Sequence, residues 1–130
     1  MQRLVDMGFK RVGCWTANGD NIIFSLGSCS DIKNVLYAFI CEGTVLYIGK
    51  TTQPLKKRMY GYQNPGPTQT TNIKGNGFIK KLVTSGKEVE IHALPDNGLL
   101  HYGGFHVNLA AGLEDSIVST LKPAWNKMGI

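Results

Sequence analysis

The stretch VLYAFICEGTVLYIGK, residues 35–50, contains two short segments of β-branched and aromatic residues on either side of Gly43. This pattern predicts a β-hairpin. Each strand carries one tyrosine, Tyr37 and Tyr47. A two-residue turn would direct the two rings to opposite faces, whereas a three-residue turn pairs Tyr37 with Gly49 and places both rings on one face. In the second register, the missing side chain of Gly49 would let a ligand approach the backbone.

The segments around this hairpin predict one α+β domain with a small, mostly antiparallel sheet flanked by helices. Residues 1–33 are expected to form an N-terminal extension with an extra β-hairpin, packed on the same domain as residues 34–130. The expected elements are a hairpin over 10–26 turning at Asn18-Gly19, a helix over 53–62 capped by Thr52, a loop over 63–77, a helix over 77–85 ending at Gly86, a strand over 88–94, a loop over 95–107 and a helix over 109–121.

Length and composition exclude several classes of protein. The chain has 130 residues, which suits a single domain with one core. It contains no apolar run long enough for a membrane span, and its N-terminus lacks the apolar segment of a secretory signal. The three cysteines lack CxxC spacing, so they are interpreted as reduced thiols of a cytoplasmic protein, with no spacing that predicts a zinc site.

Positive charge is concentrated in the middle of the sequence. The net charge is +5, and the span 43–87 contains no Asp or Glu. A one-sided positive field attracts polyanions such as nucleic acid, although a merely solvated basic surface would have the same composition. The candidate nucleic-acid-binding residues are Gly49, Lys50, Lys56, Lys57, Lys74, Lys80 and Lys81.

Two helices carry polar groups on faces that should point inward. Leu55, Arg58 and Tyr62 share one face of the helix that follows the hairpin, which directs Arg58 toward the core without an acidic partner nearby in sequence. Such an arginine is a candidate anion binder or a snorkelling side chain at the helix edge.

Glu114 shares an otherwise apolar face of the last helix, where a carboxylate needs a partner or a metal ion.

One carboxylate, one inward arginine and two clustered tyrosines are the groups of a phosphodiester-hydrolysing site with one divalent cation. The cation would neutralise charge on the scissile phosphate, and the arginine would stabilise the developing negative charge. A phenol or phenolate would help to activate water. For the hairpin alone, the alternative is a pair of half-buried tyrosines whose hydroxyls are solvated.

These residues resemble the signature of the GIY-YIG nucleases over residues 34–127. Val-Leu-Tyr (35–37) stands where the family has Gly-Ile-Tyr, and Tyr-Ile-Gly (47–49) matches the second motif. The C-terminal run LEDSIVSTLKPAWNK is similar to the family's closing helix and turn. The remaining motif positions follow in the family's order as Arg58, Tyr62, Glu114 and Asn126.

By this resemblance, the two hairpin tyrosines would act on the attacking water and the phosphate. Tyr37 would orient or deprotonate the water with help from Lys50, which requires a positive neighbour that favours the phenolate. Tyr47 would position the phosphate or share the role of base. A lysine directly after the second motif, as at Lys50, is also frequent in the excision-repair incision subunit and some restriction enzymes.

The resemblance also implies roles for the helical residues. Arg58 would hold the nonbridging oxygens of the phosphate. Tyr62, which replaces the histidine of homing endonucleases, would hydrogen-bond the phosphate or assist proton transfer. Glu114 would be the only protein ligand of one Mg²⁺ or Mn²⁺ ion per active site. Asn126 would fasten the last turn of the site or simply cap a helix end.

The resemblance implies a metal-dependent DNA endonuclease that leaves a 5′-phosphate and a 3′-hydroxyl, acting on double-stranded DNA. A compact chain of this kind favours a restriction or defence nuclease that cuts both strands as a homodimer, with Trp15 and Phe24 as dimer surface, DNA contact or core cover. The alternatives are a repair or mobile-element nuclease, a catalytically inactive nucleic-acid-binding module, and a basic interaction domain whose tyrosines only pack.

Overall fold

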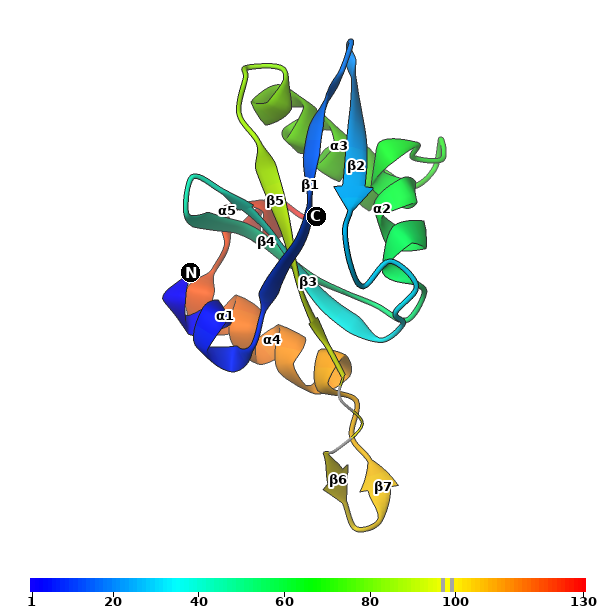
Figure 1. Ribbon diagram of the computed structural model, residues 1–130, viewed down its shortest axis with the longest axis vertical. Helices are drawn as coiled ribbons and strands as arrows, with labels where there is room; N and C mark the ends of the chain where they lie inside the picture. Colours follow the sequence, from blue (N-terminus) through cyan, green and yellow to red (C-terminus); the bar gives the residue numbers. More distant parts are fainter. Residues whose placement is uncertain (97, 99) are drawn as a thin grey trace.

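The computed structural model describes residues 1–96, 98 and 100–130. Five antiparallel strands form one sheet in the order β2-β1-β5-β3-β4, and helices cover both of its faces (Figure 1). The strands of this sheet are β1 Lys10–Asn18, β2 Asn21–Leu26, β3 Val35–Cys41, β4 Thr44–Thr51 and β5 Val89–Pro95. The predicted α+β class with a small antiparallel sheet is therefore confirmed.

The helices divide between the two faces of the sheet. They are α1 Gln2–Met7, α2 Leu55–Gln63, α3 Thr70–Val83, α4 Leu109–Leu121 and α5 Ala124–Lys127. A ribbon of β6 His101–Tyr102 and β7 Phe105–His106 projects beyond the start of α4 (Figure 1). In the described part of the chain, no helix is long and apolar enough to cross a membrane.

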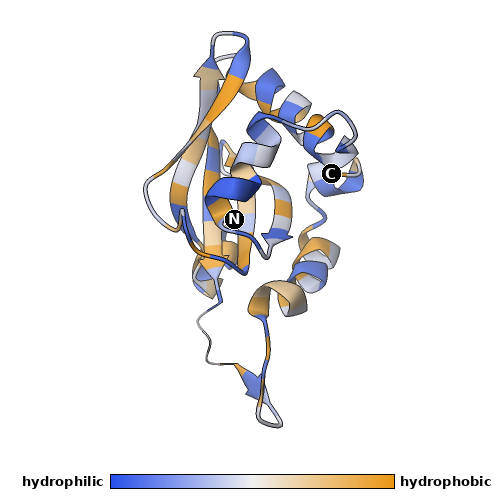
Figure 2. Ribbon diagram, turned by 90° about the vertical axis from the view of Figure 1, so that its right-hand side faces the viewer, coloured by the Kyte–Doolittle hydropathy of each residue, from blue (hydrophilic) through white to orange (hydrophobic). Residues whose placement is uncertain are grey.

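Strand β3 is the centre of the molecule because both of its faces are covered. All of its residues are buried. Tyr37 and Phe39 belong to a core that includes Trp15 of β1 and Met59 of α2. The intervening residues, such as Leu36, belong to a second core with α1 and α4. Figure 2 shows hydrophobic residues along the strands, whereas the helices carry both apolar and polar residues.

The hairpin between β3 and β4 has a two-residue turn. Cys41 pairs with Thr44, which leaves Glu42 and Gly43 as the turn residues. Their φ angles are 51° and 77°, which is typical of the primed turns that match strand twist. The three-residue turn considered for the tyrosine pairing is therefore absent.

A β-bulge restores the register that places both tyrosines on one face. The pairing shifts between Phe39 and Ile40, so that Leu46 of β4 is not paired with any residue of β3. Beyond the bulge, Tyr37 pairs with Gly49, and Phe39 pairs with Tyr47. The extra residue changes the side-chain alternation by one position. The predicted pairing is thus present, but a bulge and not a longer turn produces it.

Helix α3 begins at Thr70, whereas the composition predicts a loop over 63–77. Two of the three glycines in that segment, Gly75 and Gly77, lie inside the helix. Gly75 is buried against the ring of Tyr62, and a β-carbon placed on it would lie 2.7 Å from Tyr62 Cδ1. Glycine at this position allows close packing of α3 on α2, and tertiary contact overrides its low helix propensity.

Other boundaries differ by small amounts from those expected. Asn18 pairs with Asn21, so the first hairpin turns at Gly19-Asp20 and not at Asn18-Gly19. The segment before α2 is held by Thr51, whose Oγ1 accepts a hydrogen bond from the backbone N–H of Gln53 at 3.1 Å, and not by a cap at Thr52. The helix predicted over 109–121 is present as α4. Residues 97 and 99 of the loop expected over 95–107 lie outside the described residues.

The N-terminal hairpin shares the main sheet because β1 pairs along β5. Trp15 of β1 is fully buried. Its ring contacts Phe24 and Phe39 edge to face, with centroids 5.7 and 6.1 Å apart. Of the three possibilities, dimer surface, DNA contact and core cover, the structure shows Trp15 in the core.

The two glycines of α3 provide a matched test of this packing. Gly75→Ala should lower the free energy of unfolding by about 1–3 kcal/mol because its methyl group would overlap the Tyr62 ring. Gly77→Ala should raise it by about 0.5–1 kcal/mol, since a β-carbon on Gly77 meets nothing within 4 Å. Urea denaturation of both variants measures the difference. If both substitutions change the free energy of unfolding by the same amount, the close contact between α2 and α3 is contradicted.

Candidate functional site

The guanidinium of Arg58 connects three side chains from three elements. Its Nε donates to the hydroxyl of Tyr37 on β3 at 3.1 Å, and its Nη2 donates to the hydroxyl of Tyr62 on α2 at 2.8 Å. Its Nη1 donates to Oδ1 of Asn72 on α3 at 2.6 Å. The guanidinium carbon also lies 4.1 Å from the centre of the Tyr62 ring. Arg58 is therefore held in one orientation, as the inward helix face predicts.

All of these acceptors are neutral. Within the described residues, Arg58 forms no ion pair. Arg58 is half-buried in a wall of phenol rings and one amide, which orient the cation without cancelling its charge. A desolvated arginine whose charge is not cancelled favours an anion, since guanidinium pairs well with phosphate and carboxylate.

Tyr37 and Tyr62 form a coupled pair of buried phenols. Their hydroxyl oxygens are 2.7 Å apart, and neither side chain is exposed to solvent. Burial raises the pKa of Tyr37 far above its ordinary value, although the charge of Arg58 opposes the change. Burial likewise raises the pKa of Tyr62. The expected phenolate at Tyr37 is therefore not supported, because desolvation outweighs the positive neighbour.

The position opposite Tyr37 is filled by the tyrosine rings. A β-carbon on Gly49 would lie 2.6 Å from both Cζ and Oη of Tyr37, and 2.7 Å from Cε2 of Tyr47. The two ring centroids are 6.0 Å apart. The space expected to admit a ligand beside Gly49 is therefore occupied by phenol rings, and only glycine fits beneath them.

Asn126 of α5 holds the outer edge of the sheet at β4. Its Oδ1 accepts from the backbone N–H of Ile48 at 3.0 Å, and its Nδ2 donates to the carbonyl of the same residue at 2.9 Å. The side-chain amide thus satisfies the two groups that a further strand would satisfy. Asn126 fastens the strand that carries Tyr47 and Gly49, and it does not cap a helix.

Glu114 and Lys50 lie on the other side of β4. Lys50 follows Gly49, so strand alternation directs its side chain away from the tyrosines, and Glu114 is on α4, which packs in the second core. Burial raises the pKa of Glu114, the charge of Lys50 lowers it, and Asp115 adds to the increase. Within the described residues, the Glu114 carboxylate forms no hydrogen bond or ion pair.

The single carboxylate fits a magnesium ion that keeps most of its water. Mg²⁺ is commonly bound by one or two carboxylates together with substrate phosphates. Among the described residues, no cluster of three or more His, Cys, Asp or Glu side chains could hold a metal ion. A half-buried carboxylate without a protein partner is the donor that such a weakly held ion requires.

The candidate phosphate-binding lysines are spread over two helices. On α2, Lys56 and Lys57 are exposed, and Lys56 pairs with Asp31 at 2.6 Å. On α3, Lys74 and Lys81 are exposed and Lys80 is half-buried. In the described part of the chain, none of these lysines is hydrogen-bonded to Arg58, so they are basic residues of α2 and α3 outside the hydrogen-bonded cluster.

Sequence reasoning missed Asn72 and Gln69. Asn72 is buried and bonds directly to Arg58, and its Nδ2 donates to Oε1 of Gln69 at 3.0 Å. Both residues lie in the segment interpreted as a loop. A helical signal was present, because Asn72, Gly75 and Ile79 recur at intervals of three and four residues on the buried face.

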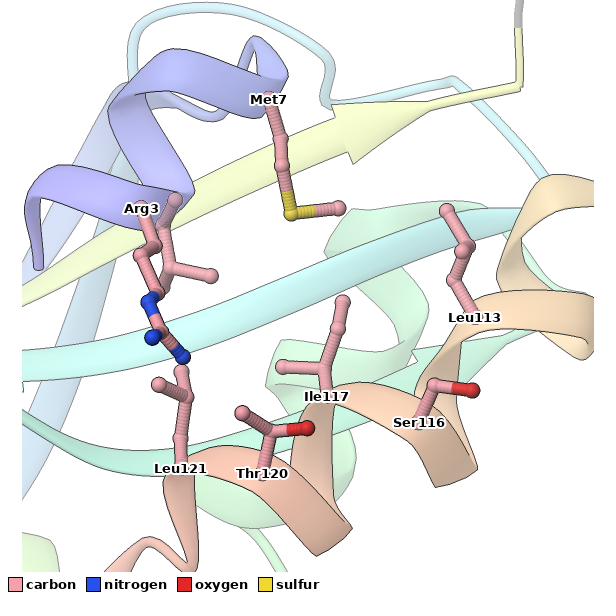
Figure 3. Close-up of a pocket in the computed structure, with 8 residues that line it drawn as sticks. Arg3, Met7, Leu113, Ser116, Ile117, Thr120 and Leu121 are labelled. Carbon is pink, nitrogen blue, oxygen red and sulfur yellow. The ribbon is translucent and has the colours of Figure 1, made fainter.

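An apolar groove of about 250 Å³ lies between α1 and α4, away from these residues. Figure 3 shows Met7 of α1 and Leu113, Ile117 and Leu121 of α4 along it, with the polar end of Arg3 at one side. None of the predicted site residues lines this groove. Its lining has no carboxylate and no tyrosine, two of the groups that the predicted chemistry uses.

The state of Tyr37 can be tested by titration. Because burial raises its pKa, folded wild-type protein and Tyr37→Phe should show the same phenolate absorbance up to about pH 10. The folded state holds this proton more tightly, so its contribution to stability is complete below about pH 10 and decreases as the pH rises above that value. A phenolate that is present in folded wild type at pH 8 and missing from Tyr37→Phe would restore the role of base.

No family model and no curated protein matches the sequence. Among solved structures, the chain is similar to a mutant of the EndoII nuclease of bacteriophage T4, with a TM-score of 0.72 and 20% identity over 96% of this chain and 95% of that one. It is also similar to the restriction endonuclease HPY188I in complex with product DNA, with a TM-score of 0.55 and 16% identity over 88% of this chain and 74% of that one. The chain therefore has a fold that these nucleases share.

Proposed function

We propose that this chain is a divalent-metal-dependent DNA endonuclease of the GIY-YIG type. The observation that carries the proposal is the Arg58 cation, which is oriented by neutral groups alone and therefore remains attractive to a phosphate. The shared fold supports a nuclease, and HPY188I was solved with product DNA. The basic surface of α2 and α3 supports a polyanionic substrate.

Some residues of the site would bind the phosphate, and others would orient the residues that bind it. Arg58 would bind the nonbridging oxygens of the scissile phosphate and stabilise the charge that develops on them. Tyr37 and Tyr62 would act as neutral hydrogen-bonding groups that orient Arg58, and Tyr47 would position the phosphate. The oxygen of a water molecule would form the new bond to phosphorus while the bond to the 3′ oxygen breaks. The water would lose one proton and the 3′ oxygen would gain one, which leaves a 5′-phosphate and a 3′-hydroxyl.

Glu114 would hold one Mg²⁺ or Mn²⁺, and Lys50 would lie beside it. A divalent ion bound there would supply charge neutralisation at the phosphate and a water of lowered pKa. Lys50 would keep the Glu114 carboxylate ionised against the effect of burial. Asn126 would keep β4 in place at the edge of the sheet, with the tyrosines on one side of this strand and Glu114 on the other.

The compact domain and its similarity to HPY188I favour a restriction or defence nuclease. One site cuts one strand at a time, so a homodimer would allow both strands to be cut in one complex. The second candidate is a nucleic-acid-binding module without catalysis. It is favoured by one observation, namely that Tyr37 and Tyr62 are buried, which raises the pKa of both phenols and disfavours a phenolate base.

Plasmid cleavage distinguishes these functions. Wild-type protein with Mg²⁺ or Mn²⁺ should cut the DNA, and Glu114→Gln should lose at least about 100-fold in rate because the ion loses its only carboxylate. Discrete fragments would support a restriction enzyme, whereas nicks or smears would support a nuclease of another role. Salt-sensitive DNA binding without cleavage of any DNA or RNA would support the binding module and overturn the enzyme.

The pH dependence of metal binding tests Glu114 and Lys50. Because the pKa of Glu114 is raised, Mn²⁺ affinity should fall with decreasing pH at a value above about 4.3, where an ordinary glutamate titrates. Lys50→Met should move this fall to higher pH, since it removes the charge that lowers the pKa. Lys10→Met, on an exposed residue of β1, is the control. If Mn²⁺ affinity depends on pH in the same way in Lys50→Met and Lys10→Met, the assigned interaction between Lys50 and Glu114 is contradicted.

A further inference from the structure

Asn72 is the one partner of Arg58 that sequence comparison with the nuclease signature does not assign. Its side chain is 9% exposed and lies between α3 and α2. Its Oδ1 accepts from Nη1 of Arg58 at 2.6 Å, the shortest bond of the guanidinium. Its Nδ2 also lies near Gly61 of α2, where a β-carbon would approach it to 3.2 Å. The amide is therefore confined on more than one side.

The orientation of this amide follows from the groups at the two ends of its hydrogen-bonded chain. The backbone N–H of Gly66 can only donate, and it donates to Oε1 of Gln69 at 2.9 Å. The same oxygen accepts from Nδ2 of Asn72 at 3.0 Å, which leaves Oδ1 for Arg58. Arg58 can also only donate. Each amide therefore has one consistent orientation, and the oxygen of Asn72 must face the arginine.

We propose that Asn72 is a positioning residue that holds the Arg58 guanidinium through a neutral oxygen, so that the charge stays available to a phosphate. This inference rests on the proposed nuclease function. Gln69 and the turn at Gly66 set the orientation of Asn72. The segment between α2 and α3 thereby controls the placement of Arg58, although it supplies no group that touches the phosphate.

A neutral acceptor is required at this position for an electrostatic reason. A carboxylate of the same shape would accept the same hydrogen bond from Arg58 and would pair with its charge in a half-buried setting. Such a pair is stronger than an exposed one, because solvent screens it less. The arginine would then be as well oriented as before, yet it would attract a phosphate less. Asparagine supplies orientation without neutralisation.

The test compares Asn72→Asp with Asn72→Leu in the full chain. The first keeps an acceptor for Arg58 and adds a charge, whereas the second keeps a similar volume and removes the acceptor. The control is Asn18→Asp, which adds the same charge at an exposed position outside the Arg58 cluster. Each protein is measured for thermal unfolding, for plasmid cleavage, and for the salt dependence of duplex DNA binding in EDTA.

Asn72→Asp loses the hydrogen bond to Gln69 Oε1 but gains a charge pair with Arg58, so its unfolding temperature should fall less than that of Asn72→Leu. It should lose at least about tenfold in kcat, and the slope of its DNA affinity against salt concentration should be smaller by about one charge. Asn72→Leu should unfold at a lower temperature and keep the wild-type salt slope, because Arg58 retains its charge. Asn18→Asp should match wild type in all three measurements. If Asn72 had a purely structural role, stability and cleavage would fall together in both Asn72 variants. The salt dependence of DNA binding would then not change in either variant.

Wild-type kcat and wild-type salt slope in Asn72→Asp would overturn the inference. If both Asn72 variants fail to fold, Gln69→Leu takes their place, since Gln69 is exposed and orients the amide without touching Arg58. It should lower kcat several-fold with an unchanged slope, and wild-type kcat would overturn the inference. If wild type cleaves nothing while the slope still falls in Asn72→Asp, the proposed function fails and the charge role of Asn72 stands.

Discussion

The register between β3 and β4 is the constraint on which the candidate site depends. Side chains alternate along a strand, so a slip of one residue would send Tyr37 and Tyr47 to opposite faces. A two-residue turn alone would produce that slip, and the bulge at Leu46 prevents it. The two rings then lie over Gly49, where no side chain could fit. From the same face of β3, the Tyr37 hydroxyl accepts a hydrogen bond from Arg58.

The second constraint is the burial of a cation without an anion. Removing a guanidinium from water is costly, and proteins usually offset the cost with a carboxylate. Here two phenols and an amide accept its hydrogen bonds. The same burial raises the pKa values of Tyr37 and Tyr62, which keeps the acceptors neutral. Burial therefore maintains the unbalanced charge that makes the cluster suitable for a phosphate, and it disfavours a phenolate base.

Much of the site could be predicted because its residues stand at regular spacings. The periodicity of Leu55, Arg58 and Tyr62 identified an inward arginine, and the structure confirms that it points to the core. The helix carrying Glu114 was also predicted correctly. Asn72 was missed because glycine, proline and threonine around it resemble a loop, and the contact between Gly75 and Tyr62 that stabilises the helix joins residues far apart in sequence.

The sequence by itself determined the α+β class, the five strands of the main sheet, most helices and the order of candidate site residues, because these follow from local periodicity and from motif spacing. It missed β6 and β7, which lie in a segment predicted to be a loop. Tertiary structure alone decided how the tyrosines share one face, that Asn72 orients Arg58, and that Asn126 binds the edge of β4. It also decided that the pKa of Tyr37 is raised, because packing buries its hydroxyl. Desolvation, close packing and long-range hydrogen bonds depend on which segments meet in space, and no local pattern records that.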